Sequence, residues 1–136
     1  AAAAAEEGCV GETLGAAEGR SIARRVSDAA LAGACQKIAA DEERHAALAW
    51  RTLVWMLSVH GPEARDAADR AFVRSLAQLA VDPEAGPVVC EEVGVLDART
   101  LGALRREVAE EVIRPCREQL ASQPNHTRST SGTVSP

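Results

Sequence analysis

The chain has 136 residues, of which 46% are hydrophobic, and this is enough for one domain with its own core. The formal net charge is −5 and the basic residues are scattered, which argues against nucleic acid as a partner. No stretch approaches the run of about 20 apolar residues that spans a bilayer. Aromatic residues are almost absent, so alanine and leucine supply most of the apolar content. Because alanine has the highest helix propensity and β-branched residues are sparse, we expect an all-α protein.

The first half of the chain is expected to form two helices. A first helix is predicted over residues 6–25 and a second from about residue 28 to 60, with Ser27 and Asp28 as the candidates for the N-cap of the second. Gly61 and Pro62 then form a stop signal. Glycine readily adopts the left-handed conformation that ends a helix, and proline cannot continue one.

The second half of the chain is expected to form two further helices. A third helix is predicted over 62–80, and the prolines and glycines of 81–95 indicate a loop after it. Asp97 is placed to cap a fourth helix, which Pro115 should kink near its end because proline removes a backbone donor. Residues 122–136 are almost all polar and are predicted to form a disordered tail.

A pair of polar residues interrupts an apolar stripe on the second predicted helix. Steps of three and four residues draw the stripe, which is expected to face the core. Glu42 and His45 lie in its middle, where a carboxylate and an imidazole are costly to bury unless something pairs with them. Residues three apart project from adjacent turns, so this Glu-x-x-His can present an oxygen and a nitrogen to one metal ion. The stripe consists of Leu31, Cys35, Ile38, Glu42, His45, Ala49, Thr52 and Met56.

The first predicted helix carries a matching glutamate. Glu12 is the charged residue on an inner stripe that otherwise holds Cys9, Ala16, Gly19 and Ala23. If the two helices form an antiparallel hairpin, Glu12 and Glu42 meet at the same level. A glutamate on one helix and Glu-x-x-His on the next make up half of the di-iron carboxylate site of ferritin-like bundles.

Two segments, CVGETL at 9–14 and DEERHA at 41–46, resemble the second helix pair of the bacterial ferritin-like domain proteins. This group belongs to the di-iron carboxylate superfamily, and some of its members are described as lipoproteins. The resemblance is good over residues 7–57 and weak over the C-terminal helices. It implies a ferritin-like helical bundle and an iron cofactor in the form of a di-iron centre, with manganese as the alternative metal.

The resemblance also implies roles for individual residues. The glutamate that matches Glu42 bridges or binds iron, and the histidine that matches His45 binds through a ring nitrogen. The aspartate that matches Asp41 accepts a hydrogen bond from the histidine of the other helix pair, which fixes the orientation of that ring. The expected metal ligands of this chain are therefore Glu12, Glu42 and His45. Asp41 is expected to accept a hydrogen bond from a ligating histidine.

Only half of such a centre is present in the sequence. A complete centre needs two Glu and two Glu-x-x-His contributions, and residues 61–121 contain no histidine. The other half is expected upstream of Ala1, since the chain begins without methionine, or from a second copy of the chain; a degenerate site is the third option. The predicted organisation is a ferritin-like helix pair with the half-site over 1–60, two accessory helices over 61–121 and the tail over 122–136.

Two classes of function are compatible with these features. The first is a metal-binding protein whose di-iron site performs redox or oxygen chemistry, such as ferrous oxidation or an oxidase or oxygenase reaction; the fold does not choose among these. The second is a non-catalytic helical module, structural or attached to the cell envelope like a lipoprotein, that keeps the bundle without metal. A membrane would be reached only through a lipid anchor that this sequence does not contain, so the compartment stays open between cytoplasm and envelope.

The cysteines lack the CxxC spacing of a metal or redox motif and are expected to be small buried side chains without a metal role. Cys9 and Cys35 would lie about 15 Å apart along an antiparallel helix pair. A disulfide needs Cα atoms within about 7 Å, so no bridge is expected between them. The four cysteines are Cys9, Cys35, Cys90 and Cys116.

Overall fold

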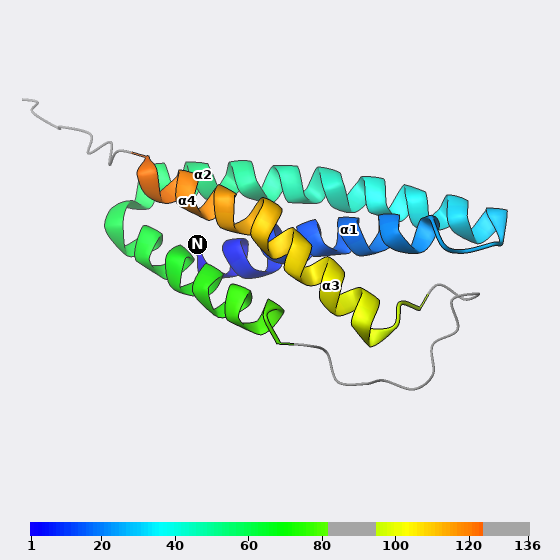
Figure 1. The fold of residues 1–136 in the computed structure, drawn as a ribbon. Coiled ribbons are helices and arrows are strands. Elements are labelled where there is room, and N and C mark those ends of the chain that lie inside the picture. Colours follow the sequence, from blue (N-terminus) through cyan, green and yellow to red (C-terminus); the bar gives the residue numbers. More distant parts are fainter. Residues whose placement is uncertain (82–94, 124–136) are drawn as a thin grey trace, which may run out of the picture.

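The computed structural model describes residues 1–81 and 95–123, and every element within these ranges is helical (Figure 1). The all-α prediction is therefore confirmed for this part of the chain. Two of the elements, η1 and η3, are π-helical and continue directly into the α-helices beside them. In chain order the elements are η1 (Ala4–Gly11), α1 (Glu12–Ala23), α2 (Ala29–Leu79), α3 (Ala98–Val108), η3 (Ala109–Ile113) and α4 (Arg114–Ser122).

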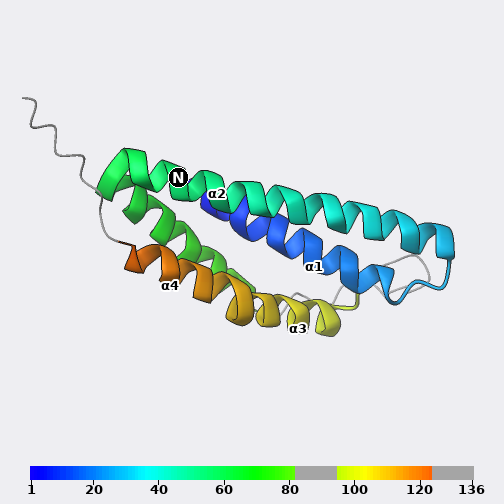
Figure 2. The ribbon, with the colours of Figure 1, turned by 90° about the horizontal axis from the view of Figure 1, so that it is seen from above.

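The predicted hairpin is present. η1 and α1 form one helical rod, and α2 returns antiparallel beside it (Figures 1 and 2). Asp28 is the N-cap of α2, because its carboxylate accepts a hydrogen bond of 2.7 Å from the backbone N–H of Leu31. A local capping interaction therefore determines where the return helix begins.

α2 consists of two rods joined at Gly61. This glycine has φ +67°, a backbone conformation that residues with a side chain rarely adopt, and the helix changes direction there. Pro62 then begins the second rod, as the sequence predicted. We refer to residues 29–60 as the first rod of α2 and to 62–79 as the second rod.

α3, η3 and α4 form a fourth rod, which lies across the hairpin and the second rod of α2 (Figure 1). Asp97 caps it as predicted, accepting a hydrogen bond of 2.8 Å from the backbone N–H of Thr100. A kink is expected at Pro115, but Ile113 and Arg114 before it keep helical dihedral angles; the π-helical turn η3 directly precedes α4. Apart from their edges, the predicted loop and tail lie outside the described residues.

The core lies where the rods meet. Its largest fully buried side chains are Phe72, Leu53, Ile113 and Cys9. Trp50 stacks on Phe72, with the ring centroids 5.5 Å apart and the planes 9° from parallel. Ion pairs on the surface also connect the rods, and each is worth at most about 1 kcal/mol because it is partly exposed. They join Arg74 to Glu6, Arg105 to Glu18 and Arg117 to Asp69.

The predicted phase of the core stripe on α2 is wrong. Each buried residue of the first rod comes one position after a residue of the predicted stripe. A shift of one residue turns the buried face by about 100° around the helix. On that rotated face Ala39 lies against Gly19 of α1, and Leu53 and Leu57 join the core cluster that contains Phe72 and Ile113. A single-helix pattern does not reveal from which side other helices approach. Ile38, expected in the core, is instead 56% exposed. The buried residues are Ala39, Ala46, Leu53 and Leu57.

Candidate metal centre

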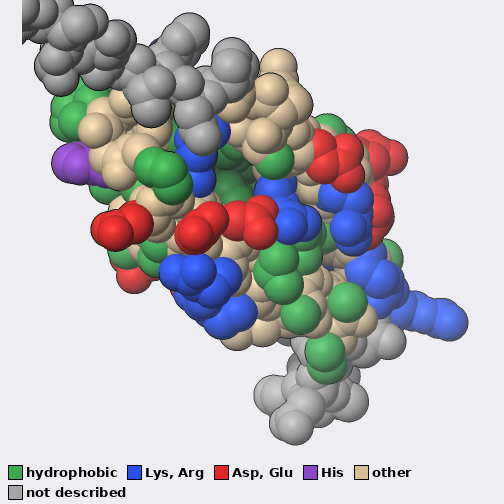
Figure 3. Space-filling model, turned by 90° about the vertical axis from the view of Figure 1, so that its left-hand side faces the viewer, with side chains coloured by type: hydrophobic (Ala, Val, Ile, Leu, Met, Phe, Trp, Pro, Cys, Tyr) green, Lys and Arg blue, Asp and Glu red, His purple; other side chains and the backbone are tan. Residues whose placement is uncertain are grey.

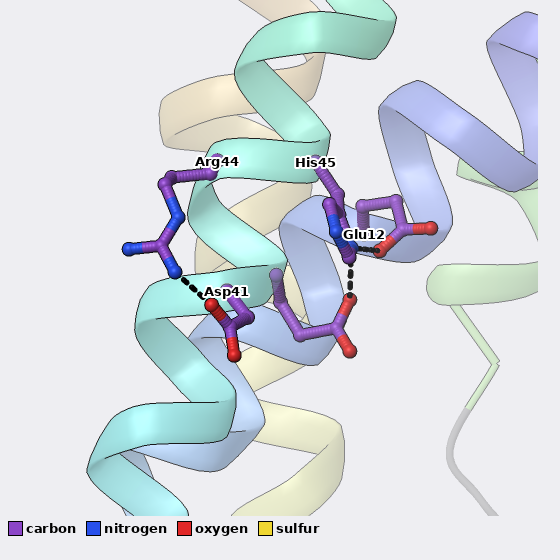
Figure 4. A network of polar contacts seen from close by, with 5 residues as sticks. Glu12, Asp41, Arg44 and His45 are labelled. Carbon is purple, nitrogen blue, oxygen red and sulfur yellow. Dashed lines mark hydrogen bonds and ion pairs between the residues drawn. The ribbon is translucent and has the colours of Figure 1, made fainter.

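The fold brings Glu12, Glu42 and His45 together (Figure 4). Glu12 is the first residue of α1, and the other two lie on adjacent turns of α2. His45 Nδ1 is 3.6 Å from Glu12 Oε2 and 3.9 Å from Glu42 Oε2. One potential ligand atom from each of the three residues lies within 4.8 Å of the others. The three residues that the sequence singled out as ligands therefore form one cluster.

The backbone around Glu12 is unusual. η1 ends at Gly11, immediately before Glu12. π-helical turns are rare in soluble proteins and occur frequently at functional sites. Nothing in the sequence pattern pointed to this turn, because the apolar spacing of the segment fits an α-helix as well.

Neighbouring residues hold the two helices in register at the cluster. A side chain at Gly15 would contact Glu42, since a Cβ at this position would lie 3.6 Å from Glu42 Cγ. This is an ordinary van der Waals distance, so α1 and the Glu42 side chain lie directly beside each other here. One residue after Glu12, Thr13 accepts a hydrogen bond of 3.3 Å from Trp50 Nε1, which ties α1 to α2.

The two carboxyl groups interact directly. A hydrogen bond with Glu12 raises the pKa of Glu42 above its usual range, and partial burial and the charge of Glu12 act in the same direction. The neighbouring Glu12 therefore favours the protonated form of Glu42. A divalent cation between them would take the place of that proton.

The cluster lies on an open surface, which differs from the expectation that it faces the core. The His45 side chain is 61% exposed, and those of Glu12 and Glu42 are 33% and 31% exposed. The reason is the rotated phase of α2: the residues buried on this part of the helix are Ala39 and Ala46, each one position beyond the predicted stripe. Asp41 is also exposed and forms an ion pair with Arg44 (Figure 4).

The other singled-out residues lie away from this cluster. The expected absence of a Cys9–Cys35 bridge is confirmed, since Cys9, Cys35 and Cys116 are all free thiols. Burial raises the pKa of the Cys9 thiol to about 12, with a smaller contribution from Cys116. Such a thiol is unreactive at neutral pH. Cys35 and Cys116 are only half-buried, and Cys90 lies outside the described residues.

The rest of the surface carries a cavity and a region of mixed charge. The cavity, of about 310 Å³, lies between the second rod of α2 and α4, lined by Arg65, Phe72, Arg117 and Leu120 among others, and it is separate from the cluster. Acidic and basic side chains are intermixed at the end of the molecule where α2 turns back (Figure 3). Among the described residues, no helix is both long and apolar enough to cross a membrane.

The chain matches no family model, no curated protein and no solved structure. The site itself must therefore support any function assigned to the chain.

The raised pKa of Glu42 leads to a prediction about the metal-free protein. A carboxyl group whose pKa is higher in the folded state binds more protons there, so its contribution to stability is present at low pH and is lost as pH rises through the folded pKa. We expect Glu42→Gln, which keeps the shape but cannot ionise, to be more stable than the wild type at pH 8. Near pH 4 the difference should disappear.

Urea denaturation of both proteins at the two pH values, with chelator present, measures this effect. Asp97 and Glu110 have lowered pKa values, and their contributions, which are lost as pH falls, are common to both proteins. The difference between the two proteins therefore isolates Glu42. A difference that is the same at pH 4 and pH 8 would contradict the raised pKa of Glu42.

Proposed function

We propose that this chain is a ferritin-like metal-binding protein in which Glu12, Glu42 and His45 bind iron as half of a di-iron carboxylate centre. The observation that carries the proposal is the convergence of two carboxylates and one imidazole, from two antiparallel helices, on a single point. The centre would serve redox or oxygen chemistry, of the ferrous-oxidation or the oxidase and oxygenase kind.

The donor atoms fit a transition metal. Two ligands bound about 2.1 Å from one ion lie at most about 4.2 Å apart. The distances from His45 Nδ1 to the two carboxylates, 3.6 and 3.9 Å, fall inside this limit before any adjustment of the side chains. A mixture of imidazole and carboxylate donors suits iron and manganese, whereas magnesium prefers oxygen ligands alone.

The roles of the chain's own residues follow from the geometry. Glu12 and Glu42 supply negative charge and oxygen donors for the cation. His45 supplies a neutral nitrogen donor. Bound iron would supply the electron transfer, and a complete di-iron centre would need a second Glu and a second Glu-x-x-His from another helix pair.

Metal uptake tests the proposal. Protein purified without oxygen is incubated with ferrous iron or manganese, separated from free metal by gel filtration and analysed for bound metal. We expect about one ion per chain, which corresponds to two ions in a complete bundle. A tenfold excess of magnesium should not displace the bound ion.

A chain that folds but retains neither metal would refute the proposal. The better interpretation would then be the non-catalytic helical module, structural or attached to the cell envelope. Circular dichroism on the same preparation establishes that the helices are formed, so that loss of metal is not confused with unfolding.

A further inference from the structure

We infer that the exposed face of α2 around Glu42 and His45 is the contact surface for a second copy of this chain, which completes the metal centre. The inference rests on the proposed function, because the second copy provides the missing ligands. We call this surface the open face and define it by four apolar residues with exposed fractions of 56%, 56%, 60% and 57%. They are Ile38, Leu48, Trp55 and Val59.

The four apolar residues of the open face share one side of a single helix. Isolated exposed apolar residues are common on protein surfaces and need no explanation. These four, however, lie together with His45 within an arc of about 100° on the first rod of α2, as their spacing shows. The same arc also holds the exposed polar residues Lys37, Asp41 and Thr52. A polar, metal-binding group in the middle of an apolar helical stripe is the pattern of a helix–helix contact that encloses a site.

The open face is complementary to itself. Consider a two-fold axis perpendicular to α2 at the midpoint between Glu42 and His45, which places two copies of α2 antiparallel. Ile38 lies about 8 Å from this point towards the N-terminus and Leu48 about 7 Å from it towards the C-terminus. Each copy's Ile38 would therefore meet the Leu48 of the other. In the same way Leu31, at about 19 Å, would lie near the other copy's Trp55, at about 17 Å.

The same two-fold axis completes the ligand set. It doubles Glu12, Glu42 and His45 at one place, which gives two glutamates and two Glu-x-x-His pairs from four helices. A two-fold dimer uses the same surface on both chains. The second copy would therefore supply the second glutamate and the second Glu-x-x-His pair at the same height along α2. The apolar contacts on both sides of the centre would exclude water from it.

Sedimentation velocity of the full chain, with and without manganese, tests the inference. We expect the mass to double when manganese is added, with two ions per dimer. Leu48→Glu and Trp55→Glu place charges in the contact and should keep the chain monomeric, lowering its manganese affinity by more than about tenfold. Val73→Glu is the matched control, because Val73 is 48% exposed but lies on the second rod of α2, outside the open face. The Val73→Glu variant should therefore dimerise like the wild type.

The ways in which the inference can fail are distinguishable. A wild-type chain that binds manganese but stays monomeric would overturn the inference and leave the proposed function standing. A chain that takes up neither manganese nor ferrous iron would overturn both. A dimer that survives Leu48→Glu and Trp55→Glu while these variants remain folded by circular dichroism would place the contact elsewhere and overturn the inference.

Discussion

Glu42→Ala and His45→Ala should each weaken binding of ferrous iron or manganese by more than about 100-fold, whereas Glu43→Ala should leave it almost unchanged. Loss of a residue that merely orients a ligand typically costs about 10–100-fold in metal affinity, and these two residues supply donor atoms themselves. Competition with a chromophoric chelator under anaerobic conditions measures the affinities.

Glu43 is a demanding control because it is the sequence neighbour of Glu42 and carries the same charge. It projects to another side of the helix, where it pairs with Arg20 at 3.1 Å. If the acidity of this stretch of α2 attracted cations without a defined geometry, all three substitutions would have similar effects. That result would refute the assignment of Glu42 and His45 as ligands.

The ends of the helices could be predicted because they depend on local interactions. Asp28 and Asp97 each bind a backbone N–H three residues ahead. Gly61 adopts the one positive φ found among the described residues. Each of these effects involves a few consecutive residues, so the sequence alone carries the information.

The meeting of Glu12, Glu42 and His45 could also be predicted from local spacing. The exposure of these residues to solvent could not. Spacing on α2 puts Glu42 and His45 on adjacent turns, and the antiparallel hairpin brings Glu12 to their level. Which face of α2 becomes buried depends on contacts between segments far apart in the chain. Because α2 has apolar residues on two faces, Ile38 and Leu48 fit a core pattern as well as the buried Ala39 and Leu53 do.

The geometry of the cluster also depends on how closely the two helices approach. A Cβ at Gly8 would lie only 2.8 Å from the Cβ of Ala49, and one at Gly19 would lie 3.0 Å from the Cβ of Ala39. The two glycines lie on either side of Glu12 along the η1–α1 rod. They therefore set the distance that the carboxylate must bridge to reach α2.

Gly8→Ala should accordingly destabilise the protein by about 1–3 kcal/mol, the usual cost of overpacking a close contact. It should also weaken metal binding, because moving the rod away from α2 separates Glu12 from Glu42. The matched control is Gly33→Ala. Gly33 is likewise helical, but a Cβ at this position would meet nothing within 4 Å, so alanine should stabilise the protein by about 0.5–1 kcal/mol through helix propensity.

Chemical denaturation followed by circular dichroism gives the stabilities, and the chelator competition gives the metal affinities. The two variants add the same methyl group to a helical glycine, so they differ only in what that group meets. Opposite signs of the stability change, with metal affinity reduced in Gly8→Ala alone, are expected. If Gly8→Ala were as stable as Gly33→Ala and bound metal like the wild type, the contact with Ala49 would not set the spacing of the helices, and the position of Glu12 would have to be explained by the π-helical turn before it.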